Sequence, residues 1–283
     1  MWLPLEVRYG LANTHEDIAS NIESALKRPN HVGFQSIMDT ESGAVSVVGS
    51  GPSLKRNWMK LRDSDTDIIA CNAAFQFLLE RGVIPKYFFC FDADPLMLEF
   101  ITPRKDVTYL IGSRCPPKAF EMLEGCNVIT VHAGGDLHLE ALLQKYNMME
   151  PMPIGGSAAV TRAMCVAPSI GYRTVHLWGA DGSFASGDTH IRKSTTDEKS
   201  MLIKLNKRVF SMAPWMTRQV DDFKTLAPSL KQLGVKLVVH GDGIIPHLAR
   251  TMGYETDEGW RMYRFKEAVA DAKLKARILW SQL

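Results

Sequence analysis

Short runs of β-branched and aromatic residues alternate with segments of helical periodicity across residues 44–250. Strands that alternate with helices pair in parallel through right-handed crossovers, so that helices cover both faces of one sheet. The pattern therefore predicts an α/β fold with a Rossmann-like, doubly wound and mostly parallel sheet. The expected strands are 45–49, 67–71, 87–91, 107–111, 127–131, 174–178 and 235–240, and the expected helices include 55–62, 73–82 and 156–170.

Three further segments are expected around this sheet. Residues 1–43 are predicted to form an N-terminal helical extension, with Asn13 or Thr14 as the N-cap of its helix. Residues 251–283 are predicted to form an amphipathic C-terminal helix. Residues 182–222 are polar and rich in Ser, Thr and Lys, and we expect a lid or acceptor-binding insertion near them because long irregular connections are usually functional.

Composition narrows the class of protein further. The 283 residues are 46% hydrophobic and carry a formal net charge of +2, which neither favours nor excludes a polyanionic partner. Five cysteines without a C-x-x-C pair indicate neither a disulfide framework nor a zinc site. No apolar run approaches the roughly 20 residues that span a bilayer. We therefore expect a cytoplasmic protein without a membrane span, and a homo-oligomer stays open.

The turn after the first expected strand is the strongest candidate for a nucleotide site. Its residues are Gly49, Ser50, Gly51, Pro52 and Ser53. Glycines let the backbone approach a phosphate or ribose closely and permit a positive φ. Proline suits the first turn of a helix, where free N–H groups attract anions. The alternative is the ordinary glycine-rich turn of an α/β protein.

Polar residues also follow the next two expected strands. Asn72 lies where dinucleotide folds place a group on a ribose hydroxyl, and its alternative role is to cap the next helix. Asp92 and Asp94 have a spacing that can hold Mg²⁺ or Mn²⁺ against a diphosphate. A hydrogen bond from the substrate to Asp94, or turn formation alone, would explain the same pair.

The second half of the chain adds three more candidates. Gly155-Gly156-Ser157 opens a helix and can bind a phosphate or allow tight helix packing. Gly179 and Asp181 follow the strand at 174–178. His190 lies in a polar loop, and its imidazole can accept a proton from an acceptor hydroxyl, although a surface histidine is the alternative.

Read in order, these motifs resemble a known family. They are Val-Val-Gly-Ser-Gly-Pro-Ser-Leu at 47–54, Cys-Asn at 71–72, Phe-Asp-Ala-Asp-Pro at 91–95, Gly-Gly-Ser-Ala-Ala at 155–159, Gly-Ala-Asp at 179–181 and Thr-His at 189–190. The set is similar to the 6-hydroxymethylpterin diphosphokinase MptE-like family, also called domain of unknown function 115. That family includes motility accessory factors, thought to transfer nonulosonic acids. The set also resembles the bacterial sialyltransferases of glycosyltransferase family 42.

The resemblance implies a transferase that uses a nucleotide-activated donor. It places Gly49, Ser50 and Gly51 against the phosphate and sugar of a cytidine nucleotide, Asn72 on the ribose, Gly156 and Ser157 near the leaving phosphate, and His190 as general base. Asp94 and Asp181 join His190 as expected catalytic residues. Ser50 and Asp94 each stand where family 42 has Asn.

The expected reaction moves a sugar from a CMP- or UDP-sugar to an acceptor hydroxyl. The acceptor is a glycan or small molecule, with nucleic acid least favoured because no nucleic-acid motif is present. An ATP-dependent diphosphokinase of the pterin type, with Asp92 and Asp94 holding Mg²⁺, is the alternative. A non-catalytic nucleotide-binding module is a third.

Overall fold

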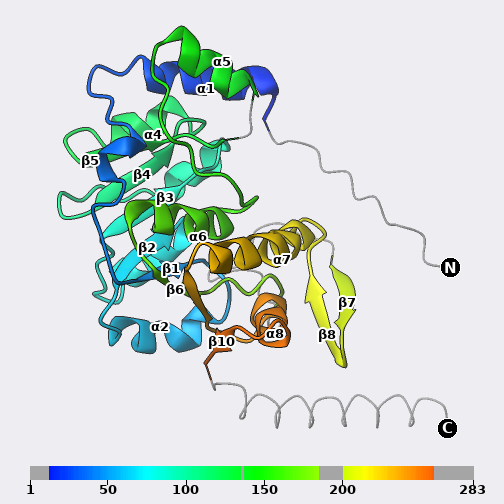
Figure 1. Ribbon diagram of the computed structural model, residues 1–283. Coiled ribbons are helices and arrows are strands. Elements are labelled where there is room, and N and C mark those ends of the chain that lie inside the picture. The colour runs from blue at the N-terminus through cyan, green and yellow to red at the C-terminus, as the bar shows by residue number, and fades with distance from the viewer. Residues whose placement is uncertain (1–12, 135–136, 185–199, 258–283) are drawn as a thin grey trace, which may run out of the picture.

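The computed structural model describes residues 13–134, 137–184 and 200–257, and its centre is a parallel sheet of eight strands (Figure 1). The strand order is β10-β9-β6-β1-β2-β3-β4-β5, and every neighbouring pair is parallel. The α/β, Rossmann-like prediction is confirmed. The strands are β1 (Ala44–Val48), β2 (Asp67–Cys71), β3 (Tyr87–Cys90), β4 (Thr108–Gly112), β5 (Asn127–Val131), β6 (Thr174–Trp178), β9 (Lys236–Val239) and β10 (Glu255–Thr256).

Two hydrophobic cores lie on opposite faces of this sheet, because successive strand residues point to opposite sides. On one face Val48 packs with α2 (Leu54–Arg62), α3 (Ala73–Leu79), η2 (Pro95–Phe100) and α4 (Pro117–Met122). On the other face Val45 and Val47 pack with η1 (Phe34–Ile37), α6 (Ala159–Ile170), α7 (Met216–Gln232) and α8 (Ile244–Thr251). Figure 1 shows α6 and α7 side by side over the sheet.

The N-terminal extension forms the predicted helix, α1 (His15–Leu26). Thr14 caps it: the Asp17 N–H donates to the Thr14 hydroxyl at 3.1 Å, and the Thr14 N–H donates back to the Asp17 carboxylate at 3.1 Å. α1 lies beside α5 (Leu137–Lys145), and together they bury a third, smaller apolar cluster near the β5 edge of the sheet (Figure 1).

The polar segment expected at 182–222 is partly regular. An antiparallel hairpin joins β7 (Met201–Leu205) to β8 (Arg208–Met212), and α7 begins at Met216. Asn206 makes the hairpin turn with a φ of +56°, a conformation that Asn tolerates better than most residues. The expectation of an irregular connection is therefore wrong for 201–222. Residues 185–199 lie outside the described residues, and a lid function stays a prediction.

The C-terminal helix expected at 251–283 falls mostly outside the described residues. Its first part differs from the prediction, because Thr251 ends α8 and residues 255–256 form β10 beside β9. By pairing with the edge strand β9, the backbone of residues 255–256 gains hydrogen bonds, whereas the first N–H groups of a helix beginning there would have no partner within the helix. Among the described residues, no helix combines the length and apolar character needed to cross a membrane.

Candidate functional site

The strand order reverses between β1 and β6, and the candidate site is at their carboxyl ends. From β1 the chain builds outward through β2, β3 and β4 to β5, then crosses back to place β6 on the other side of β1. In open α/β sheets, ligands bind at such a switch point, outside the carboxyl ends of the strands. The predicted turn at 49–53 and the residues after β6 therefore meet at the place where a ligand is expected.

The two turns are in direct contact through their backbones. The Gly49 N–H donates to the Trp178 carbonyl and the Gly51 N–H to the Gly179 carbonyl, each at 2.8 Å. A Cβ on Gly49 would lie 2.7 Å from the Gly179 oxygen, and one on Gly51 would lie 2.5 Å from it. Both positions thus require glycine for close packing of the two turns. Neither has a positive φ, whereas Gly179 has a φ of +57°.

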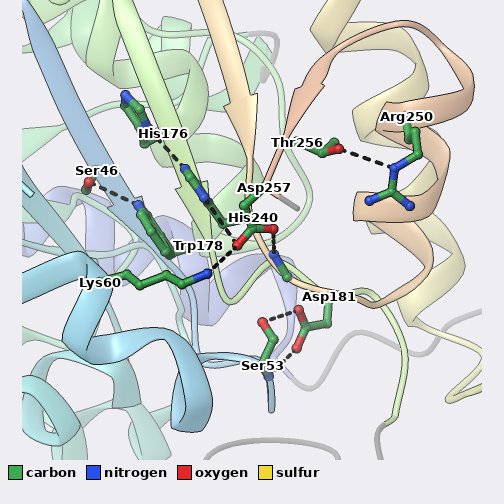
Figure 2. A network of polar contacts seen from close by, with 11 residues as sticks. Ser46, Ser53, Lys60, His176, Trp178, Asp181, His240, Arg250, Thr256 and Asp257 are labelled. Carbon is green, nitrogen blue, oxygen red and sulfur yellow. Dashed lines mark hydrogen bonds and ion pairs between the residues drawn. The ribbon is translucent and has the colours of Figure 1, made fainter. Parts of the chain in front are cut away.

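Asp181 occupies the N-terminus of α2. Its carboxylate accepts the Ser53 N–H at 2.7 Å and the Ser53 hydroxyl at 2.6 Å, and both residues are buried (Figure 2). Burial raises the pKa of Asp181 to about 6, against the opposing effect of the two Ser53 hydrogen bonds. The place predicted for a phosphate at Ser53 is therefore filled by a carboxylate of the chain itself. The structure gives Asp181 a structural contact with Ser53, and its expected catalytic role stays a prediction.

Ser50 is the residue of the turn that stays open to a ligand. It is partly exposed and forms no hydrogen bond with another described residue. Pro52 lies in the turn before α2, with its carbonyl accepting the Lys55 N–H at 3.2 Å. The N–H and hydroxyl of Ser50 are therefore the donors that this turn can offer.

Asn72 has a strained backbone at the end of β2. Its φ of +48° with a ψ of −126° is a conformation that non-glycine residues rarely adopt. Its N–H donates to the Phe89 carbonyl at 3.2 Å, and its side-chain Oδ1 is buried without a hydrogen-bond partner. Its side chain does not cap α3, the alternative role considered above. A strained residue with an unpaired acceptor beside the switch point fits a ligand-binding role.

Asp92 and Asp94 form hydrogen bonds within their own loop. The Asp92 carboxylate accepts the Asp94 N–H at 3.1 Å, and the Asp94 carboxylate accepts the Leu96 N–H at 2.9 Å, which caps η2. The described residues contain no cluster of three or more groups suited to hold a metal ion. The pair accounts for its turn without a cation, and Mg²⁺ or Mn²⁺ binding stays a prediction.

The N-terminus of α6 repeats the arrangement at α2. The helix begins at Ala159, three residues later than predicted, because Gly155 and Gly156 have positive φ values of +108° and +83°. The Ser157 N–H and hydroxyl both donate to Asp222 of α7 at 2.6 Å. Ser157 is exposed, so this carboxylate lies near solvent. His190 lies outside the described residues, and its role as general base stays a prediction.

A polar network beside the switch point was not foreseen from the sequence (Figure 2). His176 Nδ1 lies 3.0 Å from His240 Nε2, and the His240 ring stacks on Trp178 with 3.6 Å between centroids. Asp257 lies 3.7 Å from His240 Nδ1 and 3.6 Å from Lys60 Nζ. The sequence places His240 directly after the last long strand, and this position is its local signal. Its partners come from α2, β6 and the residue after β10, which local patterns do not connect.

The pKa values of His176 and Asp257 are both lowered within the network, for different physical reasons. Burial, together with the neighbouring His240 ring, lowers the pKa of His176. Burial would raise the pKa of Asp257, but the nearby His240 ring and the hydrogen bond from the Gly241 N–H hold it below its usual range. The network therefore keeps the half-buried Asp257 carboxylate charged, between Lys60 and the His240 ring.

Two arginines that no sequence motif singles out flank Phe91, the residue after β3. The Arg162 guanidinium lies 4.4 Å from the Phe91 ring centroid and the Arg114 guanidinium 5.9 Å from it. Arg114 follows β4 by two residues, so it lies at the carboxyl end of a strand as the other candidate residues do. This position after a strand is the sequence feature that could have identified Arg114 as a candidate.

Comparison with known proteins agrees with this architecture. The family model described as 6-hydroxymethylpterin diphosphokinase MptE-like matches residues 16–187. No match was found among curated proteins. The solved MAf glycosyltransferase from Magnetospirillum magneticum AMB-1 is 17% identical, with a TM-score of 0.58 over 83% of this chain and 38% of that chain. This chain thus corresponds to well under half of that protein's length, and the likeness concerns the fold. The resemblance drawn from the ordered motifs is confirmed, and the chain belongs to the 6-hydroxymethylpterin diphosphokinase MptE-like family.

Proposed function

We propose that this protein is a transferase that uses a nucleotide-activated donor, with transfer of a sugar from a CMP- or UDP-sugar to an acceptor hydroxyl as its reaction. The observation that carries the proposal is the switch point between β1 and β6, where Ser50 and the strained Asn72 lie near the carboxyl ends of β1 and β2. The family name and the glycosyltransferase neighbour both support a nucleotide-related transferase.

The proposed step needs positioning more than covalent catalysis by the protein. The acceptor oxygen attacks the anomeric carbon, the bond from that carbon to the donor phosphate breaks, and the acceptor proton passes to His190. Ser50 and the N-terminus of α6 would stabilise the negative charge on the departing nucleotide. Asn72 would hold the ribose through its buried Oδ1, and Asp181 would hold Ser53 and the first turn in place.

A diphosphokinase is the second candidate, because the family is named for that chemistry and the Asp92–Asp94 loop lies at the same edge of the sheet. In that reaction ATP would be the donor, and the acceptor oxygen would attack its β-phosphorus and release AMP. The two carboxylates would hold Mg²⁺ against the diphosphate. Strict dependence of the reaction on Mg²⁺ would distinguish this diphosphokinase from the proposed glycosyltransferase.

A thermal-shift screen of the full chain separates the candidates. ATP, CMP, CDP, UDP and GDP are each tested with and without Mg²⁺, because a ligand that binds the folded state raises the apparent stability. A shift with CMP, CDP or UDP supports the sugar donor, and a shift with ATP that requires Mg²⁺ supports the diphosphokinase. No shift with any nucleotide would contradict both.

The His190→Ala variant then tests catalysis. We expect product formation to fall at least about 100-fold, in the range of a lost general base, while nucleotide affinity stays near wild type. His15→Ala, an exposed histidine of α1, is the matched control and should keep full activity. Unchanged turnover of His190→Ala would remove it from the mechanism, and nucleotide binding without turnover in the wild type would favour the non-catalytic module.

A further inference from the structure

Two positive charges converge on one aromatic ring at the carboxyl edge of the sheet. The Arg162 guanidinium, from the first turn of α6, and the Arg114 guanidinium, from the loop after β4, both lie over Phe91. Arg162 is held there by a 2.6 Å hydrogen bond from its Nη2 to the Gly156 carbonyl. The backbone of Arg114 is held by Asn21 of α1, whose amide donates to the Arg114 carbonyl at 3.0 Å. The guanidinium of Arg162 is thus held directly, and that of Arg114 is anchored through its backbone.

Neither charge is neutralised by an ion pair with a carboxylate of the described residues. Arg114 Nε is buried and has no hydrogen-bond partner. Burial lowers the pKa of Arg162, and the like charge of Arg114 lowers it further. The charge of Asp222 raises the pKa of Arg162 and so opposes this lowering weakly. Its carboxylate, however, accepts hydrogen bonds from Ser157 and Thr161 and forms no ion pair with Arg162. Burying like charges together is unfavourable unless an anion compensates them.

We infer that Arg114 and Arg162, over the ring of Phe91, form a subsite for an oxyanion of the substrate, a phosphate or a carboxylate. A guanidinium presents parallel N–H donors that match the two oxygens of either group. Both arginines are partly exposed, so an oxyanion can reach them from solvent. Arg162 belongs to the first turn of α6 and donates to the Gly156 carbonyl, so the N-terminus of α6 lies beside this pair.

This inference rests on the proposed function for the identity of the substrate, but oxyanion binding is measured separately from turnover. The probes are inorganic pyrophosphate, for the phosphate of a donor, and pyruvate, for a carboxylate on the transferred group or acceptor. Titration calorimetry on the full chain should show saturable binding of one of them. The probe that binds identifies the source of the oxyanion.

The variants Arg114→Gln and Arg162→Gln keep side-chain length and remove the charge. Each should weaken binding of that probe at least tenfold, while the free energy of unfolding is retained or increased because the like-charge repulsion is relieved. Arg62→Gln is the matched control: Arg62 also lies over an aromatic ring, Trp58, but it is paired with Asp63 at 2.8 Å. Its variant should bind the probe as the wild type does.

Three results separate this inference from the proposed function. No saturable binding of either probe, or equal affinity in both arginine variants and the wild type, would overturn the subsite even if nucleotide transfer is observed. Loss of probe binding in the variants together with no nucleotide binding by the wild type would keep the subsite and overturn the proposed function. A large loss of stability in both variants would show that the arginines serve packing, and it too would overturn the subsite.

Discussion

The N-termini of α2 and α6 are capped in the same way but differ in burial. At each, the N–H and hydroxyl of a serine donate to an aspartate from a distant part of the chain. Asp181 at α2 is 3% exposed, whereas the contact of Asp222 at α6 lies near solvent. If the Asp222 carboxylate is displaced from the N-terminus of α6, water can solvate it. If the Asp181 carboxylate is displaced from the N-terminus of α2, it stays buried without compensating hydrogen bonds. We infer that the α2 cap is structural and that an incoming anion can replace the α6 cap.

The largest expected effect comes from the glycines beside the two caps. In Gly51→Ala the new methyl group would meet the Gly179 carbonyl and the Asp181 carboxylate, and we expect a loss of about 3 kcal/mol or more. In Gly155→Ala it would meet the flexible tip of Leu226, so the cost is the positive φ, about 1–2 kcal/mol. Urea unfolding of both variants measures the difference. Equal losses would contradict the rigid packing of the two turns.

Removal of the two aspartates tests the caps themselves. Asp181→Ala leaves two buried donors of Ser53 unpaired, and we expect a loss of about 3 kcal/mol. Asp222→Ala lets water replace the carboxylate at Ser157, so its loss should stay below about 1 kcal/mol. Denaturant midpoints with unchanged slopes would measure both values. A more destabilising Asp222→Ala would reverse the assignment of structural and replaceable caps.

The pH dependence of stability tests the burial of the α2 cap at Asp181. Burial raises the pKa of Asp181 to about 6, above the roughly 3.9 of an unfolded chain. The folded state therefore binds this proton more tightly than the unfolded state. Protonated Asp181 therefore stabilises the folded state relative to its ionised form. This stabilisation is complete below about pH 4 and is lost as the pH rises through about 6, a change of about 3 kcal/mol in the free energy of unfolding.

The measurement is the free energy of unfolding of the wild type minus that of Asp181→Asn between pH 4 and pH 7. This difference should fall as the pH rises, because the amide does not titrate. A difference that is constant with pH for Asp181→Asn would mean that the carboxyl group is not perturbed by its burial.

The smallest expected effect concerns ligand affinity. Asp222→Asn removes a carboxylate that competes for the donors of Ser157, so the nucleotide found in the thermal-shift screen should bind about two- to fivefold more tightly. Asp181→Asn, at the buried cap, should leave that affinity unchanged. Calorimetric titration resolves both. Tighter binding in Asp181→Asn would indicate that the ligand reaches the α2 cap as well.

Local periodicity was sufficient to predict most of the fold. The strands 67–71, 127–131 and 174–178 have the predicted bounds, and the cap of α1 at Thr14 follows from its local capping box. The β7–β8 hairpin was missed because its turn uses Asn206 without the glycine that usually follows. The strand ends also predicted the edge at which the polar residues of the candidate site gather.

The sequence by itself determined the parallel sheet and the carboxyl edge where Gly49, Asn72 and Asp181 collect, because alternation and turn chemistry are local properties. Only the tertiary structure decided which donors at that edge are already satisfied. Ser53 pairs with an aspartate 128 residues away and Ser157 with one 65 residues away. Such pairs depend on how the elements pack, and no local pattern in the chain specifies them. The same packing, by bringing α6 against the loop after β4, placed Arg114 and Arg162 over one ring.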